Sequence, residues 1–344
     1  MRKLLIISLF IVNALHSQDI HFSQYFVAPQ LINPASFGIF NKVEAGMQYK
    51  GQWNAFTNGY TSVAAFANKS FKSKKKSNDK KSYMSAGLNI IYDKAGDGQL
   101  THFKAELPVN VTKRVGTVGF FTGGLNVGFG QLTLKNNNFT WGNQFNGYEY
   151  NSSINSNEMS SALTKSYIDC AAGIAYTTFK KEKNVTEMSS PKNTFGLSAS
   201  HLNRPDYSIM GGGNERLKMK FNFYEYHHIY FKNSNLSITP TILVQYQGGA
   251  YEIIAGNYFR MRFKSDARYT GYNASKYISL GFFYRLKDAC AMNLLVEMKN
   301  YSFGMNYDFN ISQLTPASKT RGGLEISLKV NDAFRHLYKG FGKF

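Results

Sequence analysis

The residues in this sequence that could do chemistry lie in short polar stretches, most of which follow a run of alternating apolar and polar residues. Asp93 and Asp97 flank one such stretch, DKAGDG, and Asp-Gly loops can supply oxygen ligands to a cation such as Ca²⁺. Asp and Gly also stabilise tight turns without any ion. We favour the turn and expect no metal there.

Histidine and glycine motifs give no stronger signal for catalysis or for a cofactor. His227 and His228 are adjacent, so on a strand they point to opposite faces and cannot chelate one metal ion together. The glycines between Thr122 and Gly130 alternate along an expected strand, whereas a phosphate-binding loop joins a strand to a helix. Serine and histidine are plentiful, but no spacing selects a nucleophile. We expect no cofactor and no enzymatic activity.

The elements that must position these residues are strands, because apolar side chains recur with a period of two. In the stretch 82–93, Met84, Leu88 and Ile90 fall on one face and Ser85 and Asn89 on the other. About fourteen segments follow this rule. They are 43–51, 60–71, 82–93, 99–112, 118–131, 166–179, 193–202, 220–231, 236–247, 251–263, 277–286, 291–298, 301–309 and 322–330.

Composition narrows the protein class. Aromatic residues make up 15% of the 344 residues, and outside the N-terminus no run of apolar residues is long enough for a helical membrane span. A soluble sheet can also alternate, but the number and spacing of these strands are typical of a transmembrane barrel. We therefore predict an all-β fold, an antiparallel outer-membrane β-barrel of about 14 strands.

Charge and cysteine content exclude other classes. The net charge of +19 would suit a nucleic-acid-binding protein, but the basic residues are not gathered on a helix or within a nucleic-acid motif, so we expect no nucleic-acid partner. The two cysteines, Cys170 and Cys290, form neither a disulfide framework nor a metal-binding spacing.

The chain divides into four parts. Residues 1–17 have Arg2 and Lys3 before a short apolar run, which is typical of a cleaved signal peptide. Residues 18–42 contain Pro29 and Pro34 and are expected to form a plug or strap, residues 43–330 the barrel, and residues 331–344 a basic aromatic tail. An even strand number places both barrel ends on the periplasmic side. The lysine-rich turn 72–81 then faces the periplasm, as a solvated turn or as a docking surface for an acidic partner.

Several motifs, in this order, resemble one protein family. They are FSQYFVAPQLINPASFG followed by YKGQW, then DKAGDGQL, HLNRP, YDFNISQL and ASKTRGGLEISL. This series is similar to the PorP/SprF family of type IX secretion system membrane proteins. The resemblance implies an outer-membrane component that binds a secreted client protein, such as a gliding adhesin, or periplasmic secretion components. The barrel alone leaves a second interpretation open, a passive channel for small or hydrophobic solutes in contact with outer-membrane lipid.

Three outward stretches are candidate binding residues, because loops on a rigid barrel usually carry recognition. We expect them to converge into one binding or plug-holding surface at the extracellular mouth. The alternative is that they only tie the loops to one another and to the strap. The residues are Asp93, Lys94, Gly96, Asp97, Gly98, His201, Asn203, Pro205, Asp308, Asn310 and Ser312.

Overall fold

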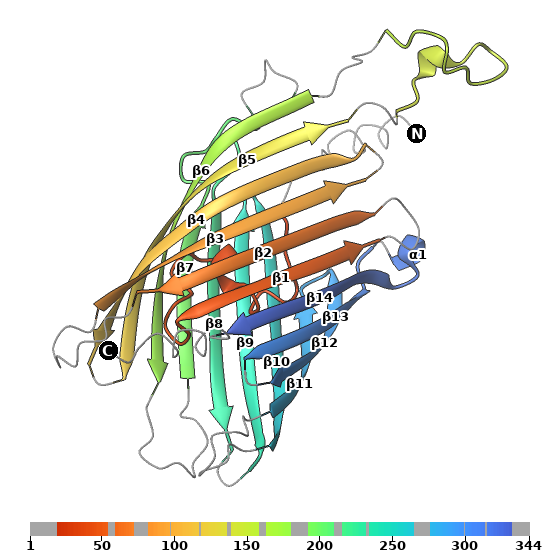
Figure 1. Ribbon diagram of the computed structural model, residues 1–344. Coiled ribbons are helices and arrows are strands. Elements are labelled where there is room, and N and C mark those ends of the chain that lie inside the picture. The colour runs from red at the N-terminus through yellow and green to blue at the C-terminus, as the bar shows by residue number, and fades with distance from the viewer. Residues whose placement is uncertain are drawn as a thin grey trace, which may run out of the picture.

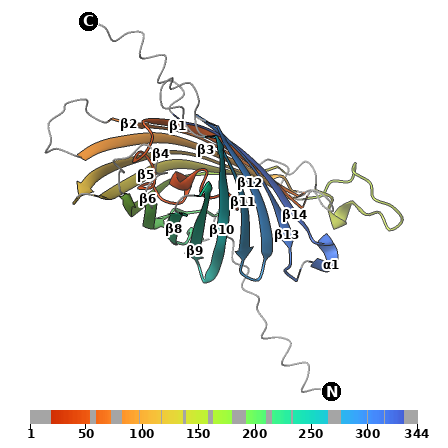
Figure 2. The ribbon, with the colours of Figure 1, turned by 90° about the horizontal axis from the view of Figure 1, so that it is seen from below.

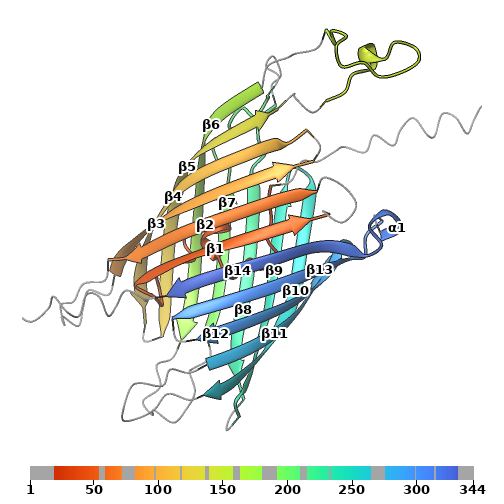
Figure 3. The ribbon, with the colours of Figure 1, turned by 45° about the vertical axis from the view of Figure 1, so that its right-hand side comes forward.

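The computed structural model describes residues 19–53, 59–71, 82–96, 98–116, 118–135, 139–157, 163–179, 192–209, 215–231, 234–264, 276–298, 300–313 and 315–331. Within these residues, fourteen antiparallel strands form a sheet that closes into a barrel, because β1 pairs with both β2 and β14 (Figures 1 and 3). The strands are β1 Val43–Gln52, β2 Tyr60–Ser70, β3 Ser82–Ala95, β4 Leu100–Val115, β5 Gly119–Leu134, β6 Leu163–Phe179, β7 Lys192–Ser200, β8 Lys220–Tyr230, β9 Leu236–Gln247, β10 Ala250–Lys264, β11 Lys276–Arg285, β12 Ala289–Met298, β13 Tyr301–Asn310 and β14 Arg321–Asn331.

The predicted fold class and strand number are confirmed, and the bounds differ by only a few residues. β6 begins at Leu163 and not at 166, because Leu163 still pairs with Leu134 of β5. Three short helices of the described residues lie outside the sheet: η2 Pro29–Leu31, η3 Gly142–Gln144 and α1 Thr315–Ser318. In the described part of the chain, no helix is long and apolar enough to span a membrane.

The barrel is apolar outside and polar inside, as the alternation predicts. On β3, Leu88 and Ile90 are 42% and 41% exposed on the outer wall, whereas Ser85 and Asn89 point inward and are fully buried. β14 repeats the pattern, with Leu328 outside and Glu325 inside. A lysine placed on such a lipid-facing wall near mid-depth costs about 2 to 4 kcal/mol, which keeps the register fixed.

Residues 19–42, which we call the strap, lie inside the lumen and lead into β1 (Figure 2). Tyr25 and Phe26 pack against Tyr258 and Phe283 of the inner wall, with ring centroids of Phe26 and Tyr258 4.9 Å apart. Further along, the Asn33 amide donates hydrogen bonds to the carbonyl oxygens of Ile174 and Leu197. The strap is therefore held by both apolar and polar contacts.

Two inward glycines make room for the strap. A Cβ atom at Gly124 of β5 would lie 2.6 Å from the Pro34 backbone, and one at Gly173 of β6 would lie 2.1 Å from the Asn33 side chain. Both approaches are closer than real Cβ contacts. Gly124 belongs to the glycine-rich run that the sequence placed on a strand, so its role here is close packing and not phosphate binding.

The two barrel ends differ in what they carry. We call the end where β1 begins and β14 ends the terminal mouth, and the opposite end the far mouth. The far mouth bears α1 and a lobe formed by residues 139–157, which extends away from the ends of β5 and β6 (Figure 1). The strap begins in the far-mouth half and descends to the terminal mouth, where Ser70 donates a hydrogen bond to the Gly38 carbonyl oxygen.

Candidate functional site

A chain of charged side chains in the far-mouth half of the lumen holds the start of the strap. We call it the His201 cluster: Asp19, Lys104, Glu106, Asp169 and His201. His201 Nε2 lies 2.6 Å from Asp19 Oδ2, and His201 Nδ1 lies 2.8 Å from Asp169 Oδ2. Lys104 Nζ then lies 3.3 Å from Asp169 and 3.0 Å from Glu106. The cluster joins β4, β6 and the end of β7 to the strap.

His201 points into the lumen because the backbone turns where β7 ends. Its φ of +59° is left-handed, a conformation that costs a non-glycine residue roughly 1 to 2 kcal/mol. The side chain is only 1% exposed. Burial alone would lower the pKa of His201, but the carboxylates of Asp19 and Asp169 outweigh burial and raise it to about 9. His201 is therefore a buried cation between two carboxylates at neutral pH.

The pKa of Asp19 is shifted in the opposite direction to that of His201. Burial alone would raise the pKa of Asp19, but His201, Lys220 and Lys104 outweigh burial and hold it well below its usual value. Asp19 is therefore ionised at neutral pH. The resulting buried ion pair links a strap residue to the inner wall.

A second group, the Glu325 cluster, holds the next residues of the strap: Ser23, Lys50, Arg285, Asp308 and Glu325. The Glu325 carboxylate accepts hydrogen bonds from the backbone N–H groups of Ser23 and Gln24, at 2.8 and 3.0 Å. Lys50 Nζ lies 3.2 Å from Glu325. The Asp308 carboxylate accepts from Ser23 Oγ at 2.8 Å and pairs with Arg285 at 2.9 Å. This cluster satisfies backbone donors that the strap would otherwise bury unpaired.

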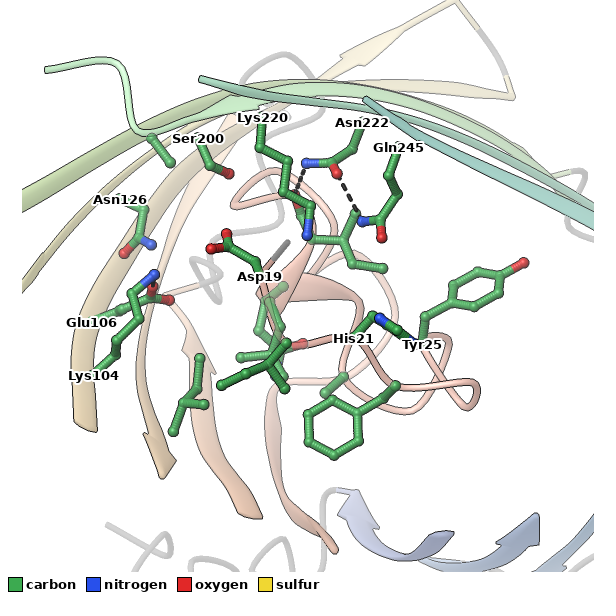
Figure 4. Close-up of a pocket in the computed structure, with 18 of the residues that line it drawn as sticks. Asp19, His21, Tyr25, Lys104, Glu106, Asn126, Ser200, Lys220, Asn222 and Gln245 are labelled. Atoms are coloured by element: carbon green, nitrogen blue, oxygen red, sulfur yellow. Dashed lines mark hydrogen bonds and ion pairs between the residues drawn. The ribbon is translucent and has the colours of Figure 1, made fainter. Parts of the chain in front are cut away.

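A narrow cavity of about 80 Å³ lies between the strap and the inner wall, lined by Asp19, His21, Lys104, Lys220 and Gln245 among others (Figure 4). Drug-sized ligands occupy pockets of roughly 300 to 1,000 Å³, so this space suits a few water molecules. Burial, with the nearby cations Lys50 and Arg285, lowers the pKa of His21 well below its usual value and keeps it neutral. Among the described residues, no group of His, Cys, Asp and Glu could hold a metal ion. The arrangement is suited to holding the strap.

The first predicted stretch, 93–98, lies at the far-mouth end of β3. The Asp93 carboxylate accepts a hydrogen bond from Ser62 of β2 at 2.5 Å. Gly96 has a φ of +61° with open space around it, as a turn requires. Gly98 lies against Phe139, Lys94 is the partner of Thr101 on β4, and Asp97 lies outside the described residues.

The second predicted stretch, 201–205, extends the sheet beyond β7. The Asn203 side chain accepts a hydrogen bond from the Cys170 N–H and donates one to the Ile168 carbonyl oxygen, so its amide replaces a missing strand partner for β6. The Pro205 carbonyl oxygen accepts from the Leu217 N–H. Of this stretch, His201 is the residue that reaches the strap.

The third predicted stretch follows β13. Asp308 belongs to the Glu325 cluster, while Asn310 donates to Ser318 of α1 and accepts from Ser312. His201 and Asp308 thus both contact the strap, His201 through Asp19 and Asp308 through Ser23. The side chains of Asn203, Asn310 and Ser312 hold turns in place. The sequence did not identify, as residues that hold the strap, Asp19, Ser23, Lys50, Lys104, Asp169, Arg285 or Glu325, since only long-range contacts define their roles.

Several solved structures are similar to this one over most of the chain, at low sequence identity. A mutant of the TodX monoaromatic hydrocarbon channel is 11% identical with a TM-score of 0.46, over 88% of this chain and 94% of that one. BamA from Haemophilus ducreyi lacking POTRA domains 1–3 is 8% identical with a TM-score of 0.42, over 84% and 70%. CdiB from Acinetobacter baumannii is 8% identical with a TM-score of 0.39, and this chain, covered over 85%, spans 60% of its length.

Sequence comparison gives a more specific result. No curated protein matches this chain. The profile of the family described as type IX secretion system membrane protein PorP/SprF matches residues 14–330, nearly the whole chain. That match covers the strap and all fourteen described strands except the last residue of β14. The protein therefore resides in the outer membrane and belongs to the PorP/SprF family of type IX secretion system membrane proteins.

Proposed function

We propose that this protein serves type IX secretion by binding proteins, either an exported client such as a surface adhesin or periplasmic secretion components, and that it catalyses no reaction. The strap inside the lumen is the observation that carries this proposal. It is fastened by the His201 cluster and the Glu325 cluster and packs on the inner wall through Tyr25 and Phe26. A passive channel needs a free path along the lumen, which the strap occupies.

The lobe at the far mouth offers a surface for such a partner. Phe145, Tyr148 and Tyr150 are 56%, 96% and 47% exposed there. The lobe has its own internal bonds, because the Gln144 amide donates to the carbonyl oxygen of Ile154 and its side-chain oxygen accepts from Tyr150. Aromatic residues on a supported loop are the type that dominates protein interfaces. With the terminal mouth assigned to the periplasm, this lobe faces the cell exterior.

The proposal is tested with full-length protein extracted in mild detergent. We expect it to co-purify with an exported adhesin or with secretion components. The Phe145→Ser/Tyr148→Ser variant should co-purify with at least tenfold less of the exported partner. Phe71→Ser is the control, because Phe71 is an aromatic residue at the terminal mouth that is as exposed as Phe145, at 56%. All variants should fold equally, as heat-resistant migration in gels would show.

The solute-channel alternative has its own measurement. Protein reconstituted alone in liposomes should pass no small sugars or hydrophobic solutes above the rate of empty liposomes. Solute flux comparable to an open porin, together with no bound partner in detergent, would overturn the proposal in favour of a channel.

A further inference from the structure

A second cavity lies below the strap, toward the terminal mouth, and is independent of the proposed partner-binding lobe. It measures about 380 Å³ and is bounded by Tyr25 and Phe26 of the strap and by the inner faces of β7 to β12. That volume falls within the range typical of small-ligand sites. We call it the terminal-mouth cavity.

Among the hydroxyl groups of the described residues that line this cavity, those of Tyr258 and Ser279 lack partners. Tyr258 is 6% exposed and Ser279 1% exposed, and neither hydroxyl has a hydrogen-bond partner among the described residues. A buried polar group without a partner costs free energy comparable to a lost hydrogen bond, so native proteins rarely leave one. Two such groups lining one cavity point to an occupant that accepts hydrogen bonds.

The charges of the cavity favour an anion. Arg260 pairs with Glu297 at 2.9 Å, which offsets one positive charge. Lys192 has no carboxylate within ion-pair distance in the described part of the chain, and its ammonium lies over the Phe40 ring, 3.3 Å from the centroid. Lys192 is therefore the amine of this cavity that lacks a counter-charge among the described residues and that an acidic ligand would pair with.

Strand register brings these donors together. Arg260 of β10 is directly opposite Ser279 of β11, and Lys192 of β7 is opposite His228 of β8. His228 Nε2 accepts a hydrogen bond from Arg260 Nη1 at 3.2 Å, so His228 connects the two cations. The cavity walls between them are aromatic, from Tyr226 and Tyr258. Hydrogen-bond donors thus face the same space as ring surfaces.

We propose that the terminal-mouth cavity binds a carboxylate attached to an apolar or aromatic group, with Lys192, Tyr258 and Ser279 as its recognition residues. The carboxylate takes the hydrogen bonds that the two hydroxyls lack and offsets the charge of Lys192. The attached apolar group packs on the tyrosine rings. This chemistry occurs in free aromatic acids and at the C-terminal residue of a polypeptide.

The test uses the full chain in a non-denaturing detergent and 3-(4-fluorophenyl)propionate as the probe, followed by ¹⁹F NMR line broadening. The neutral control is the corresponding amide, which keeps the ring and loses the charge. We expect the acid to bind at least about tenfold more tightly than the amide, the ratio that one charge-assisted hydrogen bond provides. Equal binding of acid and amide, or no binding of either, would overturn the proposal and leave a water-filled cavity.

Two variants separate binding from folding. Tyr258→Phe/Ser279→Ala removes hydroxyls that have no partner, so the unfolding midpoint should not fall, while the affinity for the acid should drop roughly tenfold or more. Lys192→Met should weaken the binding of the acid and leave the affinity for the amide unchanged. Tyr207→Phe, at the far mouth, is the matched control and should bind as the wild type does. Unchanged affinity in the double variant would also overturn the proposal.

A pentapeptide ending in phenylalanine distinguishes the two sources of the carboxylate. If the peptide with a free C-terminus binds and its C-terminal amide does not, the cavity takes polypeptide ends. If the small acid binds and neither peptide does, the cavity takes free acids. Both results support the proposal, and each names one source.

Discussion

The buried charges of the His201 cluster and the Glu325 cluster are retained because each has an opposite charge or several donors within reach. Glu325 is 1% exposed and accepts two backbone hydrogen bonds while pairing with Lys50. An ionised carboxylate buried without such partners would be strongly destabilising. At the scale of single residues, the strap is therefore held by ionic contacts that depend on protonation.

The protonation of His201 should make the stability of the folded protein depend on pH. Its pKa of about 9 in the folded protein exceeds the usual value near 6.5, so its stabilisation is complete below about pH 6.5 and is lost as the pH rises through 9. Asp19 has a lowered pKa, so its contribution is present above about pH 4 and is lost as the pH falls below that value. We expect His201→Gln to lower the urea midpoint more at pH 6 than at pH 9.5.

The comparison variant for this prediction is His21→Gln, which changes a histidine of the strap itself. Burial keeps His21 neutral in the folded protein, whereas the unfolded chain takes up a proton at His21 near pH 6. His21→Gln should therefore lower the urea midpoint less at pH 6 than at pH 9.5, which is the opposite trend to His201→Gln. If the loss caused by His201→Gln were the same at pH 6 and pH 9.5, the ionic role of His201 would be refuted.

At the scale of elements, one part of the outer wall breaks the apolar rule. Glu225 and His227 lie on the outward face of β8 and bind each other, with Phe223 and Ile229 on either side along the strand. His228, on the inward face, bonds instead to Thr239, so the prediction that the adjacent histidines face opposite sides is confirmed. Asn193 is the register partner of His227, which continues the polar surface onto β7.

This pair should reduce the stability of the barrel in lipid. Both side chains are polar and poorly solvated on a lipid-facing wall, and replacing even a buried ion pair by well-packed apolar residues is often neutral or stabilising by about 1 to 4 kcal/mol. We therefore expect Glu225→Leu/His227→Leu to be the more stable protein, measured by urea unfolding from phospholipid vesicles. Leu88→Lys, on the outer wall of β3, is the opposite control and should lose about 2 to 4 kcal/mol. A double leucine variant less stable than the wild type would show that the pair stabilises the wall.

At the scale of the whole molecule, the barrel and strap form one unit with two distinct ends. The even number of described strands brings the start of β1 beside the end of β14, where Glu44 pairs with Asn331. The lobe and α1 lie at the opposite end (Figure 3). Which end faces the periplasm decides which partners can reach the lobe and which ligands can reach the terminal-mouth cavity.

Cysteine labelling in intact cells tests this orientation. On a background with Cys170 and Cys290 replaced by alanine, we expect Asn151→Cys in the lobe to react with a membrane-impermeant thiol reagent and Asn235→Cys at the terminal mouth to stay unlabelled. Asn235 is exposed, so permeabilised cells should label both positions. The reverse pattern in intact cells would invert the assigned orientation. The lysine-rich turn 72–81, which the sequence places at the same mouth as Asn235, lies outside the described residues.

The sequence by itself determined the strands, because alternation is a local property that each segment carries alone. The opposite faces of Leu88 and Asn89 could be assigned from their neighbours, and the structure places both residues as expected. Turn residues such as Gly96 were also recognisable, because a positive φ favours glycine.

Only the tertiary structure decided what the inward residues bind. Ser23 and Glu325 are 302 positions apart, and Asp19 and His201 are 182 apart, so no local pattern links them. The unpartnered hydroxyls of the terminal-mouth cavity likewise depend on tertiary structure, because the cavity forms between the strap and the inner faces of β10 and β11. Strand alternation fixes which way a side chain points, but the closure of the sheet and the path of the strap fix which charges meet, and that depends on packing over the whole chain.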